Sequence, residues 1–123
     1  MPNSSSSQTL PILLNLVAAL LGALGQYLYK TGAARIGKES LLTNWRLFTG
    51  AALFTVVMVL FIAAFKLGGR LSVTYPAYAT TFAWSGLIAV FLAGETWSTW
   101  QTAGTLAIML GVGLIGYGAT VGA

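Results

Sequence analysis

Hydrophobic residues fill four long runs of the chain, and short polar segments separate one run from the next. Each run has roughly the 17 to 25 residues that cross about 30 Å of hydrocarbon as a helix. Strands of a membrane barrel are about half as long and alternate in polarity, so these runs predict helices. The sequence therefore predicts an all-α membrane protein with four transmembrane helices. Their predicted ranges are residues 10–29, 45–65, 71–93 and 100–121.

The segments outside the runs predict one bundle. Residues 1–9 form a polar leader without the basic residues that open a secretory signal peptide, so we expect the first run to be retained. Residues 10–123 are then one domain, because the chain is too short for a second. The connections after the second and third runs are short, which predicts antiparallel neighbours.

Polar positions within the runs are informative because each polar side chain is costly in lipid. One face of the first run carries a polar seam, namely Asn15, Gly22, Gln26 and Tyr29. One face of the third run carries another, namely Thr74, Tyr78, Thr81 and Ser85. Such groups either hydrogen-bond a neighbouring helix or line a cavity. Two seams together favour a shared cavity.

A lysine closes the first seam. Alone, Lys30 at a helix end is typical of a side chain that reaches the interface and anchors the helix. Gln26 lies one turn deeper on the same side, and Arg46 begins the second run on the same side of the membrane. An amide donor beside two cations suits an anionic oxygen such as phosphate, so the three residues are interpreted as an anion clamp.

Pro76 and Glu95 mark the two ends of the third run. Proline removes a backbone donor, which predicts a bend or loosened turn that either shapes packing or exposes backbone to a ligand. Glu95 is the one acid close to membrane depth, and we expect it to cap or pair at a helix end. No carboxylate lies within a run, which disfavours proton-coupled export of organic cations.

Glycines recur along one side of the last run, at Gly104, Gly111 and Gly118. Small residues let membrane helices approach closely. We therefore predict a dimer packed through this helix, with a second copy or a related four-helix subunit as partner. The protomers are either parallel or inverted.

Composition narrows the function classes. The chain of 123 residues is 57% hydrophobic and 7% charged, with a net charge of +4, and it contains neither cysteine nor histidine. The basic residues are scattered, which argues against nucleic acid. Without cysteine or histidine a metal site has little support, and no cofactor is expected. No nucleophile and base are within plausible reach of each other, so we expect a protein that is not an enzyme.

Basic residues also bear on orientation. Four lie in or beside the first connection and two in the second. The positive-inside tendency favours cytoplasmic first and third connections with both termini outside, although so small an excess also permits either orientation.

Three segments together resemble a known family: "GALGQYLYKTGA", "LSVTYPAYATTFAWSGLIAVFLAGE" and "GTLAIMLGVGLIG". Their order is similar to that of the four-helix, EamA-like members of the drug/metabolite transporter superfamily. The chain looks most like the subunits of the undecaprenyl-phosphate-aminoarabinose flippase and is more distantly similar to the small multidrug resistance transporters. The multidrug transporters carry a helix-one glutamate where this chain has Gly22, so antiport by that route is in doubt.

The resemblance implies a transporter or flippase subunit, in the inner membrane of a bacterium, for a polyprenyl-phosphate-linked sugar or similar anionic lipid. The residues expected to bind substrate are Gln26, Lys30, Arg46, Tyr75, Tyr78, Thr81, Trp84 and Glu95. One alternative is an exporter of metabolites or hydrophobic amines with an aromatic pocket of Tyr75, Tyr78 and Trp84. Another is an accessory membrane subunit that transports nothing itself.

Overall fold

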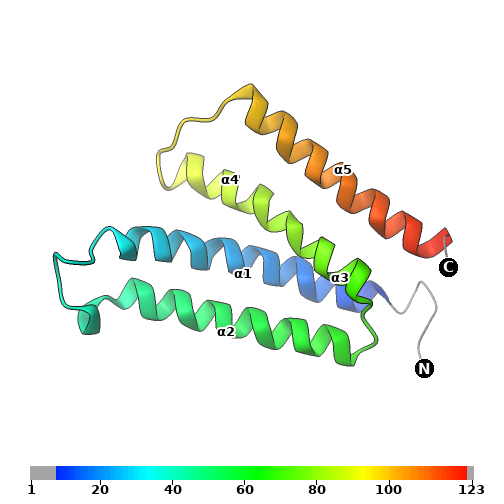
Figure 1. Cartoon of the computed structure of the whole chain (residues 1–123), viewed down its shortest axis with the longest axis horizontal. Coiled ribbons are helices and arrows are strands. Elements are labelled where there is room, and N and C mark those ends of the chain that lie inside the picture. Colours follow the sequence, from blue (N-terminus) through cyan, green and yellow to red (C-terminus); the bar gives the residue numbers. More distant parts are fainter. Residues whose placement is uncertain (1–7, 122–123) are drawn as a thin grey trace.

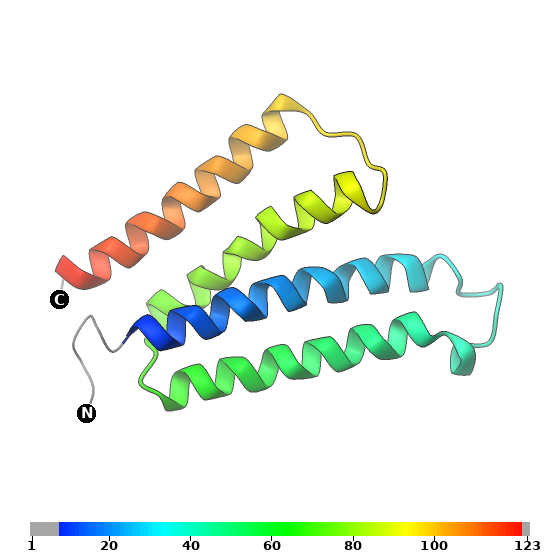
Figure 2. The same cartoon turned by 180° about the vertical axis from the view of Figure 1, so that it is seen from behind.

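The computed structural model describes residues 8–121, which form a set of antiparallel helices without a β-strand (Figure 1). Most of the predicted leader, residues 1–7, and the last two residues lie outside the described part. Seen from either side, α1 and α2 lie together, the broken helix α3–α4 follows, and α5 is outermost (Figure 2). The elements are α1 (Thr9–Ala33), η2 (Leu41–Thr43), α2 (Trp45–Lys66), α3 (Leu71–Ala77), η3 (Tyr78–Thr80), α4 (Thr81–Phe91) and α5 (Thr99–Val121).

Three of the helices, α1, α2 and α5, are long and apolar enough to cross a membrane. Their bounds differ from the predicted ones by a residue or so, except at the end of α1. There the helix continues to Ala33, so Lys30 lies inside its last turn and not beyond it. The Thr31 hydroxyl donates to the Tyr27 and Leu28 carbonyls at 3.2 Å, which lets a polar residue continue the helix.

Glycines bring α1 and α2 close together. A Cβ on Gly50 would lie 2.8 Å from the Tyr29 ring and 3.2 Å from the Gly25 carbonyl oxygen. A Cβ on Gly25 would lie 2.8 Å from the Phe54 ring. The Tyr29 and Phe54 rings stack with centroids 5.2 Å apart. Each aromatic ring therefore fills the space that a glycine of the other helix leaves, and Tyr29 packs against α2.

Side-chain amides fasten both ends of the α1–α2 pair. Asn44 is buried and donates from Nδ2 to the Gly32 carbonyl at 2.9 Å. At the opposite end, Gln8 donates from Nε2 to the Gly68 carbonyl at 3.0 Å and accepts from the Arg70 backbone N–H at 2.9 Å. Asn44 thus adds a donor to a carbonyl in the last turn of α1, and Gln8 bonds two backbone groups of the connection after α2.

The third predicted helix changes from α-helix to a 3₁₀ turn just after Pro76. An α-helical segment, α3, passes directly into the 3₁₀ turn η3 and then into α4, without a break between Leu71 and Phe91. The bend or loosened turn was predicted at Ser72, before the proline, whereas the structure keeps α-helix there and has a tighter 3₁₀ turn after Pro76. Neither α3, with 7 residues, nor α4, with 11, is long enough to span alone.

The polar seams of α1 and of the broken helix approach each other. A Cβ on Gly22 would collide with the Tyr78 hydroxyl, so the glycine makes room for the tyrosine. Asn15 and Thr74 are fully buried, and each donates to a carbonyl of its own segment, Asn15 Nδ2 at 3.0 Å and Thr74 Oγ1 at 2.8 Å. Toward the start of α1, the polar residues of the two seams are therefore buried between the helices. The pocket with polar side chains lies at the other end of α1.

Helix α5 is attached to the rest mainly at its ends. The Trp97 side chain, just before α5, packs on Gly86 of α4, where an added Cβ would be 2.7 Å from the indole ring. The Trp97 Nε1–H donates to Thr102 Oγ1 at 2.7 Å. Near the other end, Arg70 donates to the Ala119 carbonyl at 3.4 Å. A Cβ would meet nothing within 4 Å at each glycine predicted for the dimer, namely Gly104, Gly111 and Gly118.

Candidate functional site

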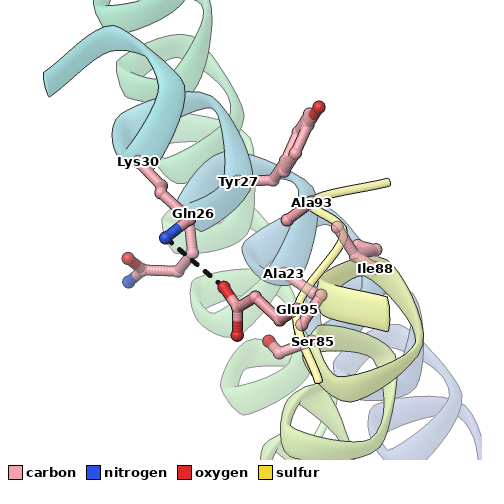
Figure 3. Close-up of a pocket in the computed structure, with 9 residues that line it drawn as sticks. Ala23, Gln26, Tyr27, Lys30, Ser85, Ile88, Ala93 and Glu95 are labelled. Atoms are coloured by element: carbon pink, nitrogen blue, oxygen red, sulfur yellow. Dashed lines mark ion pairs between the residues drawn. The ribbon is translucent and has the colours of Figure 1, made fainter. Parts of the chain in front are cut away.

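A pocket that combines apolar walls with a few polar side chains lies between the end of α1, α4 and the connection that leads to α5 (Figure 3). It encloses about 220 Å³. Small-molecule sites usually enclose about 300–1,000 Å³, so this pocket has room for only part of a ligand of that size. The lining residues are Ala23, Gln26, Tyr27, Lys30, Ser85, Ile88, Ala89, Ala93 and Glu95.

Helix geometry places two of the polar groups together. Gln26 and Lys30 are one turn apart on α1 and project on the side of Glu95 (Figure 3). Ser85 comes from α4, four residues after Thr81 on the predicted seam. The pocket therefore combines the outer end of one predicted seam with that of the other.

A tight turn delivers the carboxylate. Gly94 has φ +69°, a left-handed conformation that glycine adopts without strain. Directly after it, the Glu95 N–H donates to the Ala89 carbonyl at 2.9 Å, which folds the chain back over the end of α4. Glu95 then faces α1, and its Oε2 lies 3.3 Å from Lys30 Nζ. The expectation that Glu95 pairs at a helix end is confirmed.

The ion pair is partly open to its surroundings. The Lys30 side chain is 61% exposed and the Glu95 side chain 46% exposed. A pair this exposed to water contributes about 0–1 kcal/mol, so little free energy is needed to separate it. The two charges nevertheless cancel in the closed pair. An anion that binds Lys30 competes with Glu95, and a cation that binds Glu95 competes with Lys30.

Arg46 does not join this pocket. It lines a separate one on the connection between α1 and α2, and its guanidinium carbon lies 4.8 Å from the centre of the Trp45 ring. Its backbone is close to the end of α1, because a Cβ on Gly32 would lie 3.2 Å from Arg46 Cβ. The side chain turns toward Trp45 instead of Lys30, so the structure does not form the three-residue clamp.

The other predicted site residues also lie outside the lining of this pocket. Tyr75 is 62% exposed and meets Phe61 edge-on at 5.9 Å, while Tyr78 packs at 5.1 Å from the same ring. Thr81 begins α4 and Trp84 lies one turn further along it. Both tyrosines therefore pack on Phe61 of α2.

Sequence reasoning missed most of the lining. Ser85 belongs to the predicted seam, so its spacing could have placed it in the site. The apolar lining residues have no comparable signal, since alanine and isoleucine occur on every face of these helices. Within residues 8–121 no cluster of three or more acidic residues could hold a metal ion.

Comparison of the chain with protein-family models, with curated proteins and with solved structures yields no match.

Proposed function

We propose that the protein is a transporter or flippase subunit that moves an anionic, lipid-linked headgroup, such as a polyprenyl-phosphate-linked sugar, across a bacterial inner membrane. The observation that carries the proposal is the pocket at the end of α1, whose lining includes an ammonium, an amide and a hydroxyl, those of Lys30, Gln26 and Ser85. Such donors suit a phosphate joined to a hydroxyl-rich group. The resemblance to four-helix transporters points to the same class.

The membrane arrangement follows from the helices. Three helices have the length and apolarity of spans, and the segment from Leu71 to Phe91 continues without a break for about 30 Å at 1.5 Å per residue. In the proposed arrangement this segment is the fourth crossing. The open glycine face of α5 packs against a second protomer or a related four-helix subunit.

In this proposal, opening of the Lys30–Glu95 ion pair is the first step of binding. A phosphate takes the place of the Glu95 carboxylate at Lys30, and the Glu95 connection moves away from α1. The headgroup then occupies the small polar pocket, while the tail leaves it toward apolar surface. An apolar pocket of about 420 Å³ between α4 and α5, lined in part by Leu87, Val90 and Leu106, offers such surface.

The test is binding of polyprenyl phosphate to the purified protein. Lys30→Ala should abolish it, because the variant removes the sole cation lining this pocket. Lys66→Ala, an exposed lysine at the far end of α2, is the matched control and should bind normally. Glu95→Gln should bind more tightly, since the competing carboxylate is gone. Unchanged binding by Lys30→Ala would refute the assignment.

One observation favours a second candidate, an exporter of amines. Glu95 gives the pocket a carboxylate, which suits an ammonium as well as it suits Lys30. In that case Glu95→Gln should abolish gradient-driven uptake of a labelled hydrophobic amine into vesicles. Lys30→Ala should then increase the uptake. The two candidates thus predict opposite effects for the same pair of variants.

A further inference from the structure

A second charged pocket lies at the same end of the molecule, on the connection between α1 and α2. It encloses about 580 Å³ and is lined by Thr31, Ala34, Arg35, Lys38, Glu39 and Arg46. Three of these side chains are cations and one is a carboxylate. The pocket is therefore positive at neutral pH, unlike the pocket of Lys30, whose single cation is balanced by Glu95.

The cations of this pocket differ in their partners. Arg35 Nη1 lies 3.3 Å from Glu39 Oε2, so the single carboxylate of the pocket is engaged by one arginine. Among the described residues no ion pair engages Lys38 or Arg46. The Trp45 ring stacks against the Arg46 guanidinium at 4.8 Å and limits its movement. Lys38 and Arg46 are thus available to an outside anion.

Large apolar side chains on the same connection and at the start of α2 are exposed. Ile36 is 54% exposed, Leu42 is 84% exposed and Trp45 is 55% exposed. In water this much exposed apolar surface beside cations is unfavourable, whereas at the level of lipid headgroups both kinds of side chain find suitable surroundings. The connection therefore fits the membrane interface, with its apolar side chains in the acyl region.

We propose that this pocket binds the phosphodiester group of an anionic membrane phospholipid through Lys38 and Arg46. The charge of the pocket complements a single phosphate, and the exposed apolar side chains contact the acyl chains of the same lipid. In the orientation that the positive-inside tendency favours, this connection lies at the cytoplasmic leaflet, which carries anionic lipid. The site is separate from the pocket of Lys30, and the inference does not depend on the function proposed there.

Quenching of Trp45 fluorescence by brominated lipid tests the proposal at the pocket itself. The protein would carry phenylalanine at the other three tryptophans, and helical circular dichroism would verify its fold. It would be placed in phosphatidylcholine vesicles that contain brominated phosphatidylglycerol at increasing mole fraction. The substituted positions are Trp84, Trp97 and Trp100.

In the protein that keeps only Trp45, brominated phosphatidylglycerol should quench the Trp45 fluorescence at a lower mole fraction than brominated phosphatidylcholine does. Lys38→Gln should weaken that preference about fivefold, the effect of one basic residue close to an anionic surface. Arg46→Gln should weaken it at least as much. Lys66→Gln, which removes the same charge at the opposite end of α2, should leave it unchanged.

Three results would overturn the proposal. Equal quenching by the two brominated lipids would show that the pocket does not select an anionic headgroup. An equal loss for Lys38→Gln and Lys66→Gln would show attraction by net charge alone. Loss of the preference on addition of inorganic phosphate, but not of sodium chloride at the same ionic strength, would assign the pocket to free phosphate.

Discussion

Gly50→Ala should destabilise the protein, although alanine is the better helix former. Gly50 lies within α2 where that helix crosses α1, and the added Cβ would be 2.8 Å from the Tyr29 ring. Ordinary van der Waals contact begins at 3.4 Å, so the two helices must separate by roughly half an ångström. The ring cannot retreat easily, because it stacks on Phe54.

Two opposing effects set the magnitude. Overpacking of a close interface typically costs about 1–3 kcal/mol. Replacing glycine by alanine in a helix returns up to about 1 kcal/mol of backbone propensity. Gly113→Ala in α5 supplies the matched control, because a Cβ there meets nothing within 4 Å. The propensity gain is similar in both variants, so the difference between their unfolding free energies should be about 1–3 kcal/mol.

The assay is reversible unfolding in detergent micelles, followed by helical circular dichroism. The Tyr29→Ala background provides a second check, since removal of the ring should make Gly50→Ala neutral or stabilising. The reasoning fails if Gly50→Ala and Gly113→Ala have equal unfolding free energies. It also fails if the effect of Gly50→Ala is the same with and without the Tyr29 ring.

Three further changes probe other contacts by the same unfolding assay. Gly22→Ala should destabilise by about 1–3 kcal/mol through collision with the Tyr78 hydroxyl, and Tyr78→Phe should rescue part of the loss; absence of rescue would contradict this contact. Asn44→Ala should cost about 0.5–1.5 kcal/mol, because the Gly32 carbonyl loses the Asn44 donor while it keeps the Arg35 N–H, and a neutral result would contradict it. Gln8→Ala should cost a similar amount, and Gln8→Glu, which keeps only the acceptor, should recover part of it.

The helices could be predicted from the sequence because a run of about twenty apolar residues has few other outcomes in lipid. The pairing of Glu95 followed from an equally local rule. The facing of the two seams was also expected, and the contact of Gly22 with Tyr78 realises it. Each of these predictions depends on residues close in sequence or on one helical period.

Arg46 shows what local rules leave out. Its position on the side of Lys30 was predicted, but the direction of its side chain depends on Trp45, to which the guanidinium turns. A long side chain at a helix start has several rotamers, and a neighbouring ring decides among them. From the sequence alone, the contact of Arg46 with Trp45 could not be distinguished from an anion clamp that Arg46 shares with Lys30.

Glycines show the same limit. The spacing in α5 drew attention to Gly104 and Gly111, yet Gly25 and Gly50 bring two helices of the same chain together. What distinguishes the two sets is an aromatic ring across the interface, which periodicity in one helix does not reveal.

The contacts between α1 and α2 have a consequence for biosynthesis. All of the stacked rings and close glycines of this pair lie before Lys66, in roughly the first half of the chain. A nascent chain can therefore assemble the hairpin while the ribosome is still adding α4 and α5. Helix α5 is synthesised after this hairpin and can dock on it once the hairpin has formed. Variants of the α5 glycines should consequently leave insertion of the first two helices intact. A bulky residue at Gly25 or Gly50 should instead prevent the hairpin from packing and lead to its degradation by membrane proteases.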